Sequence, residues 1–384
     1  MWIPRNVRET ILDAARTRPA ILLTGIRQVG KSSLLKRLFP EAEYVTLDKV
    51  HIAQEAETNP TKFLQRFKKQ VIIAEVQYAP TLMRHLKILI DENREENGKW
   101  ILTGSQQFNL MQQASESLAG RLRVLQLGTL SASELQQSGL LNNPSEQLWK
   151  GGFPEIWANN LRSDNFYEDY LQTYLERDLR QLLKVTNLRD YRRFLGLLAI
   201  RAGQLLNFSE LAKDLGIAVN TVKAWVNVLE SSGLIVLLPP YYQNLGKRLI
   251  KSPKVFFTDN GILCTLLNIH STVALEASTF KDSIWENFVC VELLKNGFVA
   301  GRNLFFYRDQ NAVEIDFILD HNSHITLIEA KSNELPQPQK LNFSKVQPLF
   351  SQRTLCAVAC TIDRAGLTEL KEYSLYNPLL GFQW

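Results

Sequence analysis

The chain has 384 residues, more than one compact core usually holds, so its length predicts two or three domains. Hydrophobic residues make up 45% and charged residues 22%, which is ordinary globular usage and excludes disordered, collagen-like and coiled-coil chains. Lys and Arg number 44 against 39 Asp and Glu, a net charge of +5. This mild excess suits a nucleic-acid partner without requiring one.

The longest apolar stretches, such as LIVLLPPYY from Leu234, are far shorter than the roughly 20 residues that cross a bilayer. The N-terminus MWIPRNVRETILDAA lacks the apolar run and cleavage site of a signal peptide. We therefore expect a cytoplasmic protein without a membrane segment. Its 4 cysteines lack CxxC spacing, so we expect buried thiols in place of disulfides or zinc ligands.

Residues 1–140 alternate short apolar runs with amphipathic helical patterns, in the order AILLTG, KSSLLKRLF, VIIAEV, LMRHLKILIDEN and WILTGS. This alternation predicts an α/β domain with a parallel sheet. Residues 141–254 are predicted to be mostly helical. Residues 255–384 are predicted to combine a helix at DSIWENFVCVELLKNG with strands at FFYRD, VEIDFIL and ITLIEAK. The segment LNNPSEQ near Asn142 is the best candidate for a domain boundary.

A phosphate-binding pattern, GxxxxGK[ST], follows the first apolar strand and opens an amphipathic helix. Glycines let such a loop curl its amides around phosphate, and the helix N-terminus adds positive potential. Lys31 is expected to reach the β and γ phosphates of ATP, and Ser32 to place its hydroxyl on Mg²⁺. The residues predicted to bind the nucleotide are Gly25, Ile26, Arg27, Gln28, Val29, Gly30, Lys31, Ser32 and Ser33.

The magnesium shell of such a site normally includes an aspartate at the end of a second strand. In VIIAEVQYAP that place is occupied by Ala74, and Glu75 follows it. Glu75 could polarise the attacking water. Neighbouring strand residues point to opposite faces, however, so Glu75 is not expected to replace an aspartate at position 74. We therefore predict ATP binding with slow or absent turnover.

Two further residues are candidates for catalysis. The strand WILTGSQQF ends in polar residues, of which Ser105 is placed to sense the γ-phosphate, although serines are common in turns. Arg121 in SLAGRLRV could stabilise transition-state charge in trans, which would require a homo-oligomer. The alternative for Arg121 is a solvated surface arginine.

The strings LLTGIRQVGKSSLL, VIIAEVQ, WILTGSQQF and SLAGR together resemble the bacterial and archaeal AAA-type ATP-binding proteins that carry a C-terminal domain of unknown function. The match continues through GGFPE, YLQTYLERDL, PKVFFTDNGI and YRDQNAVEIDFIL with IEAK, and covers nearly the whole chain. In that family an aspartate usually precedes Glu75, and Ala74 departs from this pattern. The resemblance implies that Ser105 is similar to the family's sensor residue and Arg121 to its finger arginine.

The segment LNFSELAKDLGIAVNTVKAWVNVLESSGLIVLLPPYY predicts a winged helix-turn-helix. Ser209 is expected to cap the first helix and Gly216 to permit the turn. The expected core residues are Leu211, Leu215, Val222, Trp225, Val226 and Leu229. The second helix would expose Asn220, Thr221, Lys223 and Asn227, and the wing would add a phosphate-binding stripe of Lys247, Arg248, Lys251 and Lys254. Contact with DNA and docking on a protein partner both remain open, since the fold does not fix the use.

VEIDFIL and ITLIEAK, joined by the turn HNSH, predict a hairpin. Glu329 and Lys331 are two apart and project from one face, where Asp316 can face them from the partner strand. Carboxylates beside a lysine can hold Mg²⁺ and orient a hydroxide for phosphodiester cleavage. With Glu286 on the preceding helix, this arrangement resembles the PD-(D/E)xK nuclease core. The predicted metal ligands are Glu286, Asp316 and Glu329, with Lys331 catalytic; the alternatives are an inactive remnant and a salt-bridge cluster.

These patterns predict three domains: an AAA-type P-loop NTPase domain over 1–140, a helical region with a winged helix over 141–254, and an α/β nuclease-like domain over 255–384. The nucleotide state is expected to control a C-terminal region that contacts DNA. The nucleotide would do so by binding one of two protein conformations more tightly than the other. The alternative is a nucleotide-dependent protein-interaction switch whose nuclease-like fold is inactive.

Overall fold

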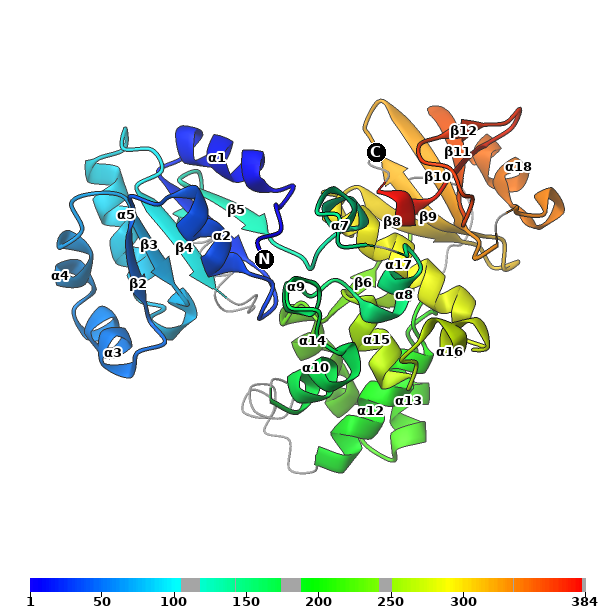
Figure 1. The fold of residues 1–384 in the computed structure, drawn as a ribbon, viewed down its shortest axis with the longest axis horizontal. Helices are drawn as coiled ribbons and strands as arrows, with labels where there is room; N and C mark the ends of the chain where they lie inside the picture. The colour runs from blue at the N-terminus through cyan, green and yellow to red at the C-terminus, as the bar shows by residue number, and fades with distance from the viewer. Residues whose placement is uncertain (105–117, 142, 174–187, 242–250, 334, 382–384) are drawn as a thin grey trace. The chain divides into compact units, whose positions relative to one another are not determined.

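The computed structural model describes residues 1–104, 118–141, 143–173, 188–241, 251–333 and 335–381. The chain divides into two compact units, as Figure 1 shows. The first, called the N-terminal unit below, comprises Trp2–Gly128 and Ser231–Gly233. The second, called the C-terminal unit, comprises Met1, Thr129–Glu230 and Leu234–Trp384.

The N-terminal unit contains the parallel α/β sheet that the sequence predicts. Five strands lie in the order β2-β3-β4-β1-β5, and every neighbouring pair is parallel. Their carboxyl ends therefore meet at one edge, where ligands bind in sheets of this kind. The strands are β1 (Ala20–Thr24), β2 (Glu43–Thr46), β3 (Val71–Ala74), β4 (Trp100–Gly104) and β5 (Leu122–Gln126).

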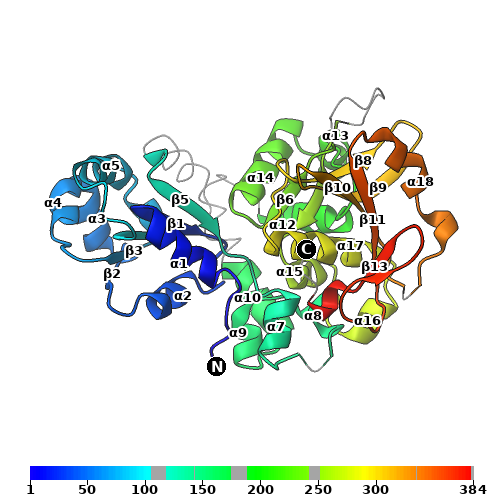
Figure 2. The same cartoon turned by 90° about the horizontal axis from the view of Figure 1, so that it is seen from above.

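Helices pack on both faces of this sheet (Figure 2). They are α1 (Arg8–Thr17), α2 (Lys31–Leu38), α3 (Val50–Thr58), α4 (Pro60–Gln65) and α5 (Leu82–Glu92). Alternate strand residues such as Leu22, Ile73 and Leu102 share one buried core with Phe63 of α4 and Leu86 of α5. α1 and α2 lie on the opposite side of the sheet. The strands β1, β3 and β4 are buried along their whole length, which explains their continuous apolar sequences.

The C-terminal unit begins with short helices held together by one buried aspartate. Asp259 accepts hydrogen bonds from the Tyr167 hydroxyl at 2.7 Å, the Gly152 amide at 2.8 Å and the Gly261 amide at 2.9 Å. A Cβ at Gly151 would lie 2.2 Å from Asp259 Oδ1. The GGFPE and TDNG motifs thus close one packed centre. The helices are α7 (Ala132–Gln137), α8 (Glu146–Lys150), α9 (Pro154–Ala158), α10 (Ser163–Tyr170), α15 (Asn260–Leu266) and α16 (Thr272–Glu276).

The next segment contains α12 (Leu188–Ile200), α13 (Phe208–Leu215), α14 (Val219–Ser231), β6 (Ile235–Leu238) and β7 (Lys254–Phe257). The strands β6 and β7 are antiparallel. Gly216 ends α13 with a φ of +71°, as the predicted turn requires. The prediction that Ser209 caps this helix is wrong, because the N-cap is Asn207. Its Oδ1 accepts hydrogen bonds from the amides of Ser209 and Glu210 at 3.1 and 3.2 Å. The expected core residues are all buried: Leu211, Leu215, Val222, Trp225, Val226 and Leu229.

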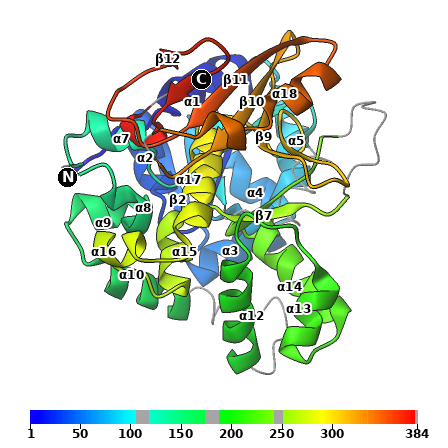
Figure 3. The same cartoon turned by 90° about the vertical axis from the view of Figure 1, so that its right-hand side faces the viewer.

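A mixed six-stranded sheet completes the C-terminal unit, in the order β12-β13-β11-β10-β9-β8. β9 and β10 form the predicted antiparallel hairpin. α17 (Lys281–Lys295) lies beside the sheet (Figure 3), and Trp285 donates to the Ala359 carbonyl at 3.1 Å. The remaining elements are β8 (Leu304–Arg308), β9 (Glu314–Asp320), β10 (His324–Ala330), α18 (Phe343–Val346), β11 (Arg353–Ala359), β12 (Thr368–Glu369) and β13 (Ser374–Tyr376).

The four cysteines are buried and unpaired, as the sequence predicts. Across the described ranges, helices are too short or too polar to pass through a membrane. Apart from residues 231–233, the predicted second and third domains share the C-terminal unit. The boundaries at 140 and 254, and the cytoplasmic location, stay predictions.

The close approach of two chain segments at Gly25 gives a test of the fold. A Cβ at Gly25 would lie 2.2 Å from the Leu127 carbonyl oxygen, and its φ is +150°. We expect Gly25→Ala to lower the free energy of unfolding by about 2 kcal/mol or more, because the clash and the backbone strain add. Urea unfolding at equilibrium measures this change.

Gly196→Ala in α12 is the matched control, since an added Cβ there meets no neighbouring segment within 4 Å. We expect it to leave stability unchanged or to raise it by about 0.5–1 kcal/mol, because glycine is unfavourable inside a helix. Equal losses in the two variants would contradict the packing described at Gly25.

Candidate nucleotide-binding site and carboxylate cluster

The glycine-rich loop joins β1 to α2 at the carboxyl edge of the parallel sheet. β1 ends at Thr24 and α2 begins at Lys31. Gly25 and Gly30 both have positive φ values, +150° and +91°, which glycine adopts without strain. Gly30 is the N-cap of α2. The first amides of a helix have no intrahelical acceptor, so this end of α2 offers N–H donors to an anion.

Lys31 is buried within its own loop, with 6% of its surface exposed. Its Nζ donates to the carbonyl oxygens of Gly25 at 2.8 Å and Ile26 at 2.9 Å. Burial lowers the pKa of Lys31 to about 8, although the charge of Glu75 acts in the opposite direction. The ammonium therefore lies at the loop with neutral hydrogen-bond partners.

The other predicted loop residues differ in exposure. Ile26 and Val29 are buried, whereas Gln28 is exposed and has a φ of +64°. Arg27 is half-buried, and its Nη2 lies 3.4 Å from the Tyr78 hydroxyl. In the first turn of α2, Ser32 is half-buried and Ser33 is exposed.

Arg5 supports the loop through two hydrogen bonds that the sequence does not indicate. Its Nη1 donates to the Val29 carbonyl at 2.8 Å and its Nη2 to the Gly128 carbonyl at 2.7 Å. The guanidinium is buried. It therefore ties the phosphate loop to the segment that follows β5. A single arginine near a charged N-terminus carries no sequence signal for this role.

Glu75 leaves the sheet with a left-handed backbone, at φ +58° and ψ +47°. β3 ends one residue earlier, at Ala74. The alternation of strand faces therefore ends at Ala74 and does not extend to Glu75. Its carboxylate accepts from Gln77 Nε2 at 2.6 Å, and its amide donates to Thr103 Oγ1 at 3.4 Å.

Of the other predicted catalytic residues of this unit, Arg121 is not brought to the loop. Ser105 lies outside the described residues. Arg121 precedes β5 at the amino edge of the sheet, where its carbonyl accepts from the Ala20 amide at 3.2 Å. A strand of 5 residues spans about 16 Å, so the two edges are well separated. Arg121 instead pairs with Asp91 through two bonds of 2.6 and 2.9 Å and holds the pKa of Asp91 below its usual range.

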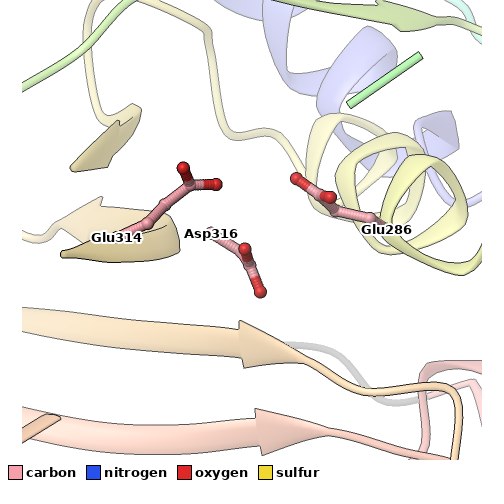
Figure 4. Close-up of side chains that lie close together, drawn as sticks. All are labelled: Glu286, Glu314 and Asp316. Atoms are coloured by element: carbon pink, nitrogen blue, oxygen red, sulfur yellow. The ribbon is translucent and has the colours of Figure 1, made fainter. Parts of the chain in front are cut away.

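A cluster of three carboxylates forms in the C-terminal unit (Figure 4). Glu314 and Asp316 extend from β9 and Glu286 from α17, and each contributes an oxygen that lies within 4.8 Å of the others. Two of these residues, Glu286 and Asp316, were predicted as metal ligands. Glu314 was missed, although its spacing of two from Asp316 on one strand could have indicated it.

Lys254 lies among these carboxylates, which corrects the sequence analysis. Its side chain is 1% exposed, and its Nζ lies 2.7 Å from Glu286 Oε1, 2.5 Å from Glu314 Oε1 and 3.9 Å from Asp316 Oδ1. It is therefore unavailable to the predicted phosphate-binding stripe of the wing. Burial by itself lowers the pKa of Lys254, but the three carboxylates together raise it above its usual value.

Of the rest of that stripe, the structure describes only Lys251. Lys247 and Arg248 fall outside the described residues, and Lys251 is exposed.

Burial raises the pKa of Glu286 to about 7, while the positive charge of Lys254 acts to lower this pKa.

Glu329 and Lys331 form a pair beside the cluster. Lys331 Nζ lies 2.7 Å from Glu329 Oε2 and 3.6 Å from Asp316 Oδ2. Glu329 is buried, and its Oε1 accepts the Asn342 amide at 3.0 Å. Both of its oxygens therefore have protein donors. The four predicted residues thus lie in one region, but lysine ammonium groups occupy the space between their carboxylates.

Comparisons with known proteins agree with the division of the chain into an N-terminal and a C-terminal unit. Residues 17–136 match a family described as an AAA domain, residues 142–273 a domain of unknown function (DUF8612), and residues 281–360 a domain of unknown function (DUF4143). The N-terminal unit, with its parallel sheet and glycine-rich loop, is an AAA-type, P-loop ATPase-like domain.

Two curated relatives cover most of the chain. The uncharacterized proteins Mb2031c of Mycobacterium bovis and Rv2008c of Mycobacterium tuberculosis are each 30% identical over 336 residues, 86% of this chain and 74% of theirs. The chain belongs to the family of these mycobacterial proteins. Among solved structures, the Walker-type ATPase PABY2304 of Pyrococcus abyssi matches with a TM-score of 0.44 and 18% identity, covering 69% of this chain and 96% of that one. The RuvB Holliday junction branch migration motor of Thermotoga maritima gives a TM-score of 0.31 and 16% identity, covering 62% and 90%.

The lowered pKa of Lys31 predicts that ATP binding takes up a proton. In the folded chain Lys31 deprotonates near pH 8, below its ordinary value of 10.5, so the unfolded chain binds more protons between these values and stability rises with pH there. A bound polyphosphate attracts the ammonium and raises its pKa. We expect ATP affinity to fall as the pH rises through about 8, with growing proton uptake.

Calorimetry of ATP binding in buffers of different ionisation heats measures this uptake. Lys31→Arg is the control, because its guanidinium stays charged at every pH tested and should take up no proton. A wild-type binding heat that is the same in all buffers above pH 8 would contradict the assignment.

Proposed function

We propose that this protein binds ATP with Mg²⁺ at the loop 25–33, hydrolyses it slowly, and uses the nucleotide state to control DNA contact by its C-terminal unit. The observation that carries the nucleotide part is the buried ammonium of Lys31, held 2.8 and 2.9 Å from two loop carbonyls at the start of a helix. A triphosphate can replace the two carbonyls as hydrogen-bond acceptor of this ammonium, because an ionised acceptor makes the stronger hydrogen bond.

The residue that would hold Mg²⁺ is Ser32. It offers a half-buried hydroxyl in the first turn of α2. Bound Mg²⁺ would offset phosphate charge during hydrolysis. Ala74 has no ligand atom, so the protein supplies fewer oxygens than such sites usually do. This shortage supports slow turnover.

Glu75 is proposed as the group that orients the attacking water, and Ser105 as the residue that senses the γ-phosphate. Arg121 lies at the amino edge of its own sheet, so a role on ATP requires a second copy of the chain. We therefore include a homo-oligomer in the proposal. Its assembly would have to exchange the Arg121 contact with Asp91 for a contact with the neighbour's phosphate.

The hydrolysis part is tested by Ala74→Asp. We expect this change to raise steady-state ATP hydrolysis at least about tenfold, equivalent to about 1.4 kcal/mol of barrier, because it adds a magnesium ligand. Ala74→Asn is the control of equal size without the charge, and it should give no gain. An Ala74→Asp variant that folds, binds ATP and hydrolyses it no faster would show that another group already completes the magnesium shell.

The DNA part rests on the segment from α12 to β7. Two helices joined at Gly216, followed by an antiparallel strand pair, support a winged helix-turn-helix. α14 exposes Asn220, Lys223 and Asn227, which suit base-edge and phosphate contacts. Residues 188–257 contain ten Lys and Arg against four Asp and Glu, so the net positive charge of the chain concentrates here.

A second candidate function is a nucleotide-dependent protein-interaction switch. The observation in its favour is that α14 presents one cation, Lys223, and that Lys254 is buried against carboxylates. Both reduce the number of phosphate contacts. In this alternative the winged helix and the nuclease-like fold dock a protein partner and cut nothing. In either case the ammonium of Lys254 opposes cleavage at the carboxylate cluster, because its Nζ lies 2.7 Å from Glu286 Oε1 and 2.5 Å from Glu314 Oε1.

DNA binding separates the two candidates. We expect duplex DNA to bind with a logarithmic salt slope of about −0.9 for each phosphate contacted, and ATP with Mg²⁺ to change the affinity. Lys223→Ala should reduce the slope by about one contact, while Lys281→Ala, on α17 and paired with Glu276 at 2.5 Å, should leave it unchanged. Weak binding without salt dependence would favour the protein switch, and identical curves with and without nucleotide would remove the coupling.

A further inference from the structure

The carboxylate cluster of the C-terminal unit has a cation at its centre, and that cation belongs to the protein. Lys254 Nζ contacts Glu286 Oε1 at 2.7 Å and Glu314 Oε1 at 2.5 Å, and it lies 3.9 Å from Asp316 Oδ1. These three residues are also the ones whose oxygens gather within 4.8 Å of one another. An ammonium and a divalent ion would therefore compete for one place.

The second oxygens of Glu314 and Asp316 are also engaged. Arg308 donates to Glu314 Oε2 at 2.7 Å, and the Ala330 amide donates to Asp316 Oδ2 at 2.8 Å. Mg²⁺ and Ca²⁺ need carboxylate oxygens at about 2.0–2.6 Å in a defined geometry. Such an ion would have to displace an ammonium that is almost fully buried. In this arrangement the residues present do not fit a divalent metal.

The backbone holds Lys254 firmly in this position. It is the first residue of β7, where it pairs with Leu238 of β6 and forms an isolated bridge with Leu205. Leu205 lies between α12 and α13, so both strand contacts come from the segment proposed as a winged helix. These pairings fix the backbone from which the side chain, itself 1% exposed, reaches the carboxylates.

We propose that Lys254 is the resident cation of this cluster, and that β7 keeps the cluster closed to divalent metal. The oxygens of the cluster are thus arranged as in a cation site, and the ammonium of Lys254 from β7 fills that site. Phosphodiester cleavage that depends on a metal bound here cannot occur while β7 is in place. This inference does not depend on ATP binding, because its residues all lie in the C-terminal unit.

The test measures Mn²⁺ binding to the full chain without nucleotide, by electron paramagnetic resonance of the free ion. Lys254→Met removes the ammonium and keeps a side chain of similar length. We expect it to bind one Mn²⁺ at least tenfold more tightly than the wild type does. Lys254→Met combined with Glu314→Gln should lose this gain. Lys251→Met, at an exposed lysine nearby, should behave as the wild type.

Thermal unfolding of the same proteins gives an independent readout. Lys254→Met leaves buried carboxylates without their cation, so its Tm should fall in a chelator and recover in Mn²⁺, since a ligand that binds only the folded state stabilises it. If this variant fails to fold in the chelator, Lys254→Met with Glu286→Gln carries one buried charge fewer and is measured in the same way.

Three results would overturn the proposal. The first is wild-type Mn²⁺ binding that Glu314→Gln abolishes, since the cluster would then be open already. The second is a folded Lys254→Met variant that gains no Mn²⁺ site. The third is failure of both Lys254→Met proteins to fold even in saturating Mn²⁺, because a cation site would restore them.

Discussion

Burying an ammonium group costs free energy unless oxygen atoms replace its water. Two lysines of this chain meet that requirement with different partners. Lys31 is surrounded by neutral carbonyls of its own loop, and burial lowers its pKa to about 8. Lys254 is surrounded by three carboxylates that raise its pKa. Neutral partners leave the charge available to an anionic ligand, whereas carboxylates neutralise it. The chemistry proposed for each site follows from this difference.

The phosphate loop was predictable because its chemistry is local. Strand, loop and helix follow one another within 20–38, and the glycines are required by φ values that the motif itself implies. The support behind the loop was not predictable, because Arg5 reaches Val29 and Gly128 only through the fold. The backbone conformation of Glu75 was not predictable for a similar reason. A strand pattern cannot show that the strand ends at Ala74 and that the next residue is left-handed.

In the C-terminal unit the hairpin and the helix were predictable from periodicity, but the position of one lysine was not. Lys254 belongs to a basic run with Lys251, and sequence alone cannot distinguish a buried member from an exposed one. Its partners lie 32 and more residues away. The motifs GGFPE and TDNG, which are part of the resemblance to the family, meet at Asp259 and position helices. Their role in the structure is packing.

The central claim is that the loop 25–33 binds the phosphates of ATP through Lys31. Equilibrium dialysis of labelled ATP with Mg²⁺ tests it most directly, using the full chain and Lys31→Met, which keeps the length of the side chain without its charge. The account predicts one ATP bound per wild-type chain and a large loss of affinity in the variant. Absence of binding to the folded wild type, or equal binding to both proteins, would contradict it.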